Sequence, residues 1–199
     1  MFIFLLIHIG GGYYLFPTLC KIFPRTPSIL LQIISSSAIS PVIASIYMLV
    51  RCRFFPKINL NKTVLLSALA GAVASWLIIL IGSVLFFGDS DPLIKQALEL
   101  RSYDLYVLLF IVTIWNPIFE ESLVRGYFFE VILKKYNAIV AIVISSILFV
   151  IPHIMWDFNL YNVFFFFLIS VVLTAVYIEG GLVASAMTHS FVNLYVTYL

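Results

Sequence analysis

Long apolar runs separated by short polar breaks dominate the pattern of this 199-residue chain. A helix needs about 20 mostly apolar residues to cross the hydrocarbon core of a membrane. Such runs predict helices over residues 1–20, 28–50, 63–87, 104–135, 137–156, 160–178 and 182–199. The breaks hold turn-forming residues, for example the pair Gly180 and Gly181. Because lipid cannot satisfy the edge of an open sheet, we expect an all-α, polytopic bundle of about seven transmembrane helices.

The composition supports a membrane protein and excludes other classes. Hydrophobic residues make up 63% of the chain and charged residues 10%, against about 45–50% and about 25% in soluble domains. A soluble globule of this length could not bury so much apolar surface. The net charge is +2 and the chain has no basic run with interleaved aromatic residues, so we expect membrane lipids and no nucleic acid among its partners.

Basic residues gather in two predicted loops, which contain Arg51, Arg53, Lys57 and Lys62 in one case and Lys134 and Lys135 in the other. If the stretch 104–135 crosses the membrane once, both loops lie on the same side. The positive-inside rule then makes that side cytoplasmic.

Glu120 and Glu121 lie inside an apolar stretch, where a charged residue costs about 2.5–3.5 kcal/mol on insertion scales. Glu121 and Arg125 are four residues apart, so they share a helix face and can neutralise each other. Glu120 lies about 100° around the helix and is left without that partner. A carboxylate buried without a partner binds protons more strongly, which suits it to activate a water. The alternative is a purely structural ion cluster.

His153 lies near the end of the next predicted helix, four residues after Phe149. The turn between the two helices falls near Tyr136 and Asn137. Glu120 and His153 are each about 24 Å from that turn at the helical rise. An antiparallel hairpin therefore brings them to the same depth in the membrane.

His189 and Asn193 are four residues apart in the last predicted helix and point to one side. A histidine and an amide aimed at one point can donate hydrogen bonds to an oxyanion. The alternative is a polar contact that only joins helices. His189 lies about 10 Å from the start of its helix, so contact with His153 requires that helix to be displaced, for example by a submerged turn at Gly180 and Gly181.

Three motifs resemble, in order and spacing, the signature of the CAAX protease and bacteriocin-processing family, also called CPBP or Abi: Glu120-Glu121-x-x-x-Arg125, Phe149-x-x-x-His153 and His189-x-x-x-Asn193. The best-known branch consists of type II prenyl-protein endopeptidases, which are glutamate-dependent intramembrane proteases. The resemblance covers about residues 104–199, as a core within a single integral membrane domain over 1–199. The helices predicted over 1–103 resemble only generic membrane segments and form the variable part.

The resemblance implies that Glu120 is the general base that activates a water, assisted by His153. His189 and Asn193 would stabilise the oxyanion, and Glu121, Arg125 and Phe149 would support the site. It implies no organic cofactor and no metal. Zinc is the minority alternative, because glutamate and histidine are also zinc ligands, although the chain lacks the His-Glu-x-x-His spacing of a one-helix zinc site.

The expected function is hydrolysis of a peptide bond in a membrane-associated peptide or protein, such as a leader or a lipidated C-terminus. The protein would be a multi-pass protein of a bacterial cell membrane. The alternative is a non-catalytic immunity or regulatory protein that binds a partner membrane protein. A transporter is disfavoured because the first three predicted helices contain almost no polar pathway. The face to which the site opens stays undecided, since the charges place it outward and the prenyl-protease branch opens toward the cytosol.

Overall fold

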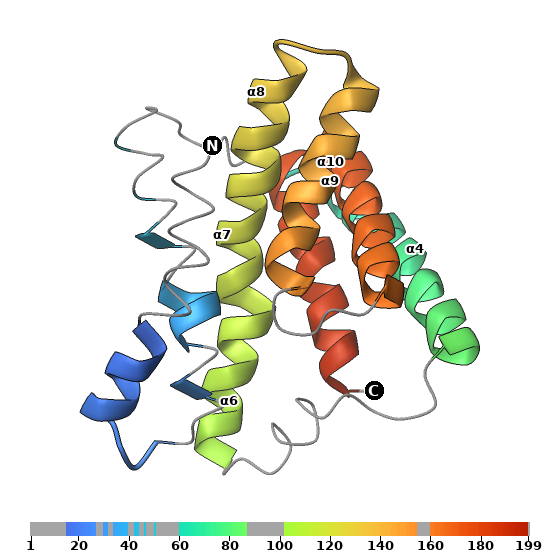
Figure 1. Cartoon of the computed structure of the whole chain (residues 1–199). Helices are drawn as coiled ribbons and strands as arrows, with labels where there is room; N and C mark the ends of the chain where they lie inside the picture. Colours follow the sequence, from blue (N-terminus) through green and yellow to red (C-terminus); the bar gives the residue numbers. More distant parts are fainter. Residues whose placement is uncertain are drawn as a thin grey trace.

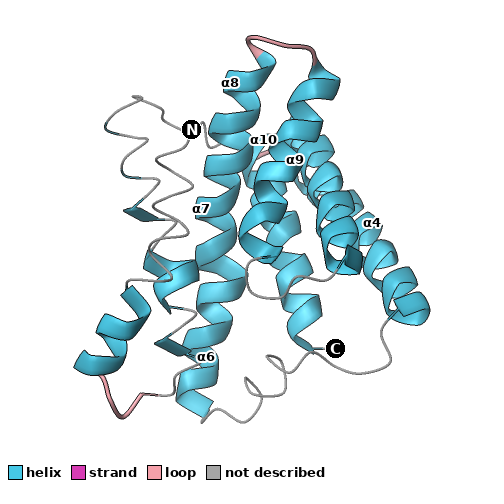
Figure 2. Cartoon of the chain, viewed as in Figure 1, coloured by secondary structure: helices cyan, strands magenta, loops and turns pink. Residues whose placement is uncertain are grey.

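The computed structural model describes residues 15–26, 30–31, 34–39, 42–43, 46, 50, 60–86, 102–154 and 160–198, which fold into helices joined by short turns (Figure 2). No strand occurs among these residues. The main elements are α4 (Lys62–Phe86), a continuous rod over 102–133, α9 (Ala138–Ile154) and α10 (Leu160–Tyr198). The rod consists of α6 (Ser102–Phe110), η2 (Ile111–Trp115), α7 (Asn116–Leu123), η3 (Val124–Phe129) and α8 (Glu130–Leu133).

The predicted helices in the second half of the chain agree with these bounds to within about two residues. The helices predicted over 1–20 and 28–50 lie largely outside the described residues, which include a short π-helix, η1 (Ile34–Ile39). The basic loop residues Arg51, Arg53 and Lys57 also lie outside the described residues. The structure therefore leaves the prediction of about seven helices untested.

The described bundle carries its apolar side chains outward and many of its polar side chains inward. Within the described ranges, three helices are long and apolar enough to cross a membrane: Lys62–Gly82, Tyr103–Leu133 and Leu160–Val196. On α4, Leu65 and Leu69 are 57% and 62% exposed, whereas Arg125, Glu121 and His189 are at most 2% exposed. Such an arrangement suits a lipid solvent, which accepts leucine outside and leaves charges to pair inside. The fold is a helical membrane bundle.

Helix α10 is folded back on itself at Gly181, as the sequence predicted for the pair Gly180 and Gly181. Gly181 has φ 76°, a left-handed conformation that glycine adopts without steric cost. The two arms, residues 160–180 and 182–198, run antiparallel (Figure 1), and the Ser185 hydroxyl donates to the Leu173 carbonyl at 3.0 Å. In a straight helix these two residues would be about 18 Å apart. The hairpin therefore places the last motif, His189 and Asn193, inside the bundle.

Small residues let α4 approach this hairpin closely. A Cβ added at Gly71 would lie 2.4 Å from Cγ2 of Val176 and 2.9 Å from Oγ1 of Thr188. A Cβ added at Gly180 would lie 2.9 Å from Cβ of Ser67. Each separation is shorter than van der Waals contact allows, so glycine is required where the helices touch.

The rod crosses the bundle once although it contains Pro117. Its far end lies beside the Gly181 turn, because Tyr177 donates a hydrogen bond to Glu130 at 2.9 Å. The start of α4 lies at the same end, where Ser67 meets Gly180, and Figure 1 shows the two helix ends and the turn together. The described ends at Lys62 and Lys134 therefore lie at the same end of the bundle, and the side of the membrane on which they lie stays a prediction.

Candidate active site

Three helical segments bring the predicted site residues into one cluster inside the bundle. The rod supplies Glu120, Glu121 and Arg125, helix α9 supplies Phe149 and His153, and the second arm of α10 supplies His189 and Asn193. Ion pairs, hydrogen bonds and ring contacts link all of these except Asn193 to one another. The predicted displacement of the last helix is thus achieved by the hairpin in α10.

Glu121 is the centre of the cluster and is fully buried. Its Oε1 accepts hydrogen bonds from Nη1 of Arg125 at 2.8 Å and from Nδ1 of His189 at 2.9 Å. Its Oε2 accepts a hydrogen bond from the Ser185 hydroxyl. The predicted pair with Arg125 is present, and the same carboxylate also orients His189. Charge-assisted hydrogen bonds of this kind are the strongest that a protein makes.

Arg125 extends this network to the first arm of α10 and to α9. Its Nη2 donates to the Ser170 carbonyl at 2.9 Å and to the Ser170 hydroxyl at 2.6 Å. The guanidinium carbon lies 4.7 Å from the centre of the Phe149 ring, within the range of a cation–π contact. Removing one partner of a buried ion pair leaves an uncompensated charge and costs about 3–5 kcal/mol.

Sequence reasoning missed Ser170 and Ser185, the two serines of this network. Both are buried polar residues in apolar helices, and Ser185 lies one helical turn before His189. That spacing is a usable signal for Ser185. It is a weak one, because serine in a helix commonly bonds to the carbonyl of its own preceding turn. Ser170 carries no comparable signal, since its partner lies 45 positions away in the chain.

His189 is held so that its second nitrogen faces Glu120. A carboxylate only accepts hydrogen bonds, so Nδ1 of His189 carries the proton in its contact with Glu121. The other nitrogen, Nε2, lies 3.8 Å from Oε2 of Glu120. This is longer than a direct hydrogen bond. A group bound beside the two side chains could therefore contact both of them.

Glu120 lacks the partners that its neighbour has. Its side chain is 12% exposed, and Oε2 is buried without a hydrogen-bond partner among the described residues. Arg125 directs its guanidinium to Glu121, and the group within ion-pair distance of Glu120 is Nε2 of His189. Glu120 is thus a buried acceptor that is available to an outside donor.

His153 is placed by the ring of Phe149 and by its own helix. The two rings have centroids 4.6 Å apart, and Phe166 packs against His153 at 4.5 Å. Nδ1 of His153 lies 2.8 Å from the Phe149 carbonyl. Because a carbonyl can only accept, Nδ1 carries the hydrogen and a neutral ring keeps Nε2 as an acceptor. His153 also lies within electrostatic reach of Glu120 and His189.

Asn193 is engaged with the backbone of the rod. Its Nδ2 donates to the Val112 carbonyl at 2.8 Å. In the π-turn η2 the Asn116 N–H bonds to the Ile111 carbonyl, five residues back. In that register the Val112 carbonyl would pair with the N–H of residue 117, but proline has none. Asn193 thus supplies the missing donor, a contact that the sequence did not predict, and its role at an oxyanion stays a prediction.

Asn116 is a further polar residue of the rod that sequence reasoning did not single out. Its side chain is 8% exposed, and its buried Oδ1 has no hydrogen-bond partner among the described residues. It lies one helical turn before Glu120 on the same face of α7. The signal was present in the sequence as an amide four residues before a buried glutamate, next to a proline.

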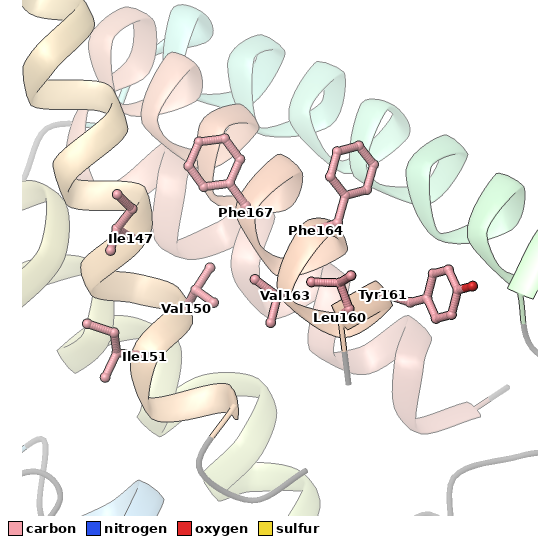
Figure 3. A pocket seen from close by; sticks show the side chains of 8 residues that line it. All are labelled: Ile147, Val150, Ile151, Leu160, Tyr161, Val163, Phe164 and Phe167. Atoms are coloured by element: carbon pink, nitrogen blue, oxygen red, sulfur yellow. The ribbon is translucent and has the colours of Figure 1, made fainter. Parts of the chain in front are cut away.

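An apolar groove runs beside the cluster, between α9 and the first arm of α10 (Figure 3). Its volume is about 660 Å³. The walls include Val150 and Ile151 from α9 and Val163 and Phe164 from α10, and Figure 3 shows Val150 and Val163 between the two helices. None of the site residues lines this groove, and Ile151 and His153, two residues apart on α9, point to different faces of that helix. A groove of this character suits a hydrocarbon chain.

Within the described part of the chain, no group of three or more His, Cys, Asp or Glu residues could hold a metal ion. The carboxylate of Glu121 is engaged by three donors, from Arg125, His189 and Ser185. The expectation that the site needs no metal and no organic cofactor stays a prediction.

Residues 102–195 match the family model described as type II CAAX prenyl endopeptidase Rce1-like. The match covers the rod, α9 and almost all of α10, and it contains all three motifs. Comparison with curated proteins and with solved structures gave no match.

Proposed function

We propose that this chain, which belongs to the CAAX protease family through residues 102–195, is an intramembrane endopeptidase in which Glu120 activates the water that hydrolyses a peptide bond. The observation that carries the proposal is the buried Oε2 of Glu120. This atom has no hydrogen-bond partner among the described residues. It lies beside His189, whose other ring nitrogen is hydrogen-bonded to Glu121. A base placed in this way contributes typically about 10²–10⁴-fold to a rate.

The reaction starts when Glu120 takes a proton from water as the water oxygen bonds to the scissile carbonyl carbon. The negative charge that develops on the carbonyl oxygen needs a donor. His189 can supply one from Nε2 when its ring carries both protons, with Glu121 at Nδ1 as the counter-charge. The carbon–nitrogen bond then breaks, and the leaving amine takes the proton from Glu120.

His153 assists Glu120 during the interval between these two proton transfers. Its Nδ1–H is occupied by the Phe149 carbonyl, so Nε2 of the neutral ring can accept a hydrogen bond from the protonated carboxyl group. This contact would keep the proton within the site until the amine leaves. Phe149 fixes the plane of the ring and lies against His189 with the ring centroids 5.4 Å apart.

The proposed substrate is a membrane-associated peptide or protein with a lipid-modified end. The apolar groove between α9 and α10 would take the hydrocarbon part, because its walls are aliphatic and aromatic. The peptide part would extend from the groove around α9 to Glu120 and His153. The name of the matched family points to a prenylated C-terminus, and we adopt a prenylated peptide as the first substrate to test.

The test uses purified protein in liposomes with a fluorogenic farnesylated peptide that ends in a CAAX sequence. Glu120→Gln keeps the shape of the side chain and removes the base, so we expect cleavage to fall by at least about 10²-fold. Cleavage by Glu120→Gln at the rate of the unaltered protein would contradict the proposal. So would the absence of cleavage by the unaltered protein, and that outcome would favour the alternative of a non-catalytic partner-binding protein.

A further inference from the structure

Two polar side chains of the rod and one backbone carbonyl that accepts a side-chain hydrogen bond follow one another in a row along the helix. Val112, Asn116 and Glu120 follow at intervals of four residues, which places them on the same side of the helix. The second arm of α10 meets both ends of the row, because His189 lies at Glu120 and Asn193 donates to the Val112 carbonyl. Asn116 stands between these two contacts and therefore faces the same arm.

Two oxygen atoms of this row are acceptors without donors. The buried Oε2 of Glu120 and the buried Oδ1 of Asn116 have no hydrogen-bond partner among the described residues. A buried polar group without a partner costs about 1–3 kcal/mol, and proteins commonly satisfy such groups with bound water. Water fits this pair because it carries two donor hydrogens.

The spacing of the two residues also fits a single water. Side chains four residues apart on a helix have Cβ atoms about 5–6 Å apart. One water that makes two hydrogen bonds of about 2.8 Å each can bridge side-chain oxygens at such a separation. The hydroxyls of Ser75 and Ser146 are also buried and unpartnered, but neither lies on the rod.

We propose that Asn116 is a catalytic residue that holds the nucleophilic water together with Glu120, an inference that rests on the proposed function. The water donates one hydrogen to Oε2 of Glu120 and the other to Oδ1 of Asn116. Both lone pairs of the water oxygen stay free, and one of them is directed at the scissile carbonyl carbon.

The proton balance of the step assigns each hydrogen. Glu120 removes the hydrogen that points to it as the oxygen–carbon bond forms. The hydrogen that Asn116 holds stays on the oxygen and becomes that of the new hydroxyl group in the tetrahedral intermediate. When the carbon–nitrogen bond breaks, the amine takes the proton from Glu120 and the peptide fragment leaves with a new carboxyl group.

The experiment measures cleavage of the farnesylated peptide by Asn116→Leu, which keeps a similar volume and removes the acceptor. We expect kcat to fall by about 100-fold with KM within about twofold, because the water is misplaced and the peptide still binds. In Asn116→Ala a second water can enter the vacated space, and kcat should fall by about 10-fold or more. This variant replaces the leucine variant in the test if the leucine variant does not fold. Ser75→Ala removes another buried, unpartnered oxygen and should keep the kcat of the unaltered protein.

The outcomes separate this inference from the function on which it rests. If Glu120→Gln is inactive while the folded Asn116 variants keep kcat within about threefold of the unaltered protein, Asn116 does not hold the water. If Glu120→Gln cleaves normally, the proposed function itself is wrong. A high-resolution structure gives an independent reading, in which a water bonded to both oxygens supports the inference and a site where Asn116 bonds to a protein group contradicts it.

Discussion

Glu120 and Glu121 are neighbours in the sequence and have opposite surroundings in the bundle. Glu121 is fully buried and receives hydrogen bonds from Arg125, His189 and Ser185. Glu120 is slightly exposed, and its Oε2 receives no hydrogen bond from the described residues. A rotation of about 100° along one helix therefore separates a carboxylate that joins helices from one that is open to a ligand.

The difference indicates how a membrane bundle can keep a reactive carboxylate. Burying a lone charge in lipid is expensive. Beside Glu120, the carboxylate of Glu121 and the guanidinium of Arg125 neutralise each other on the rod, and Arg125 also contacts Ser170 of α10 and Phe149 of α9. That network holds His189 and the rod in place. Glu120 can then stay without a partner because its position does not depend on its own hydrogen bonds.

The largest loss of stability is expected from Arg125→Met. The variant leaves Glu121 as a buried charge without its strongest partner, so the free energy of unfolding in mixed micelles should fall by about 3–5 kcal/mol. Lys134→Met is the control, because it removes a cation from an exposed position. It should change the free energy of unfolding by less than about 0.5 kcal/mol. The double variant Glu121→Leu with Arg125→Met should recover part of the loss. A double variant that loses the sum of both single effects would show that the two residues do not act as a pair.

A smaller effect is expected from Ser185→Ala, which removes one of the donors to Glu121 and a contact between the arms of α10. We expect a loss of about 1–3 kcal/mol, the cost of leaving a buried acceptor unsatisfied. Ser190→Ala is the control, because among the described residues its hydroxyl bonds to the Ala186 carbonyl of its own helix. Equal melting temperatures for the two variants would argue against a bridging role for Ser185.

The contact between Asn193 and the rod predicts an interaction with Pro117. Asn193→Leu should cost about 1–3 kcal/mol of stability, because the Val112 carbonyl loses its donor. In a Pro117→Ala background the new N–H at residue 117 can serve that carbonyl, so the same substitution should cost less. A double-mutant cycle measures the coupling. Equal costs in both backgrounds would mean that Asn193 does not compensate for the proline.

No effect is expected from metal removal. The proposed reaction uses Glu120 and two histidines, so incubation with a chelator should leave cleavage of the farnesylated peptide within experimental error of the untreated protein. Loss of activity that zinc restores would overturn the metal-free assignment and would make the same side chains metal ligands.

Helical spacing predicted much of this site from the sequence. The i,i+4 relation of Glu121 and Arg125, the equal distances of Glu120 and His153 from their turn, and the glycine pair in α10 are local properties that a helix converts directly into geometry. The structure brings these residues together. The roles proposed for them in catalysis stay predictions.

The partners that come from distant segments could not be predicted in the same way. Ser170 contacts Arg125 only because α10 folds back at Gly181, and both arms of the hairpin must be placed before that contact exists. Asn193 donates to the Val112 carbonyl because the π-turn η2 shifts the backbone register, so that this carbonyl would otherwise pair with Pro117, which has no N–H. An apolar sequence pattern does not reveal a π register, since the inserted residue changes the hydrogen bonds and leaves the hydropathy unchanged.

The most direct test of the account measures peptide cleavage and thermal unfolding side by side for Glu120→Gln and Glu121→Gln. The account predicts that Glu120→Gln abolishes cleavage while its melting temperature stays within about 2 °C of the unaltered protein, and that Glu121→Gln lowers the melting temperature by several times that amount. Retained cleavage in a folded Glu120→Gln variant, or a melting temperature that falls for Glu120→Gln and not for Glu121→Gln, would contradict the division of roles between the two carboxylates.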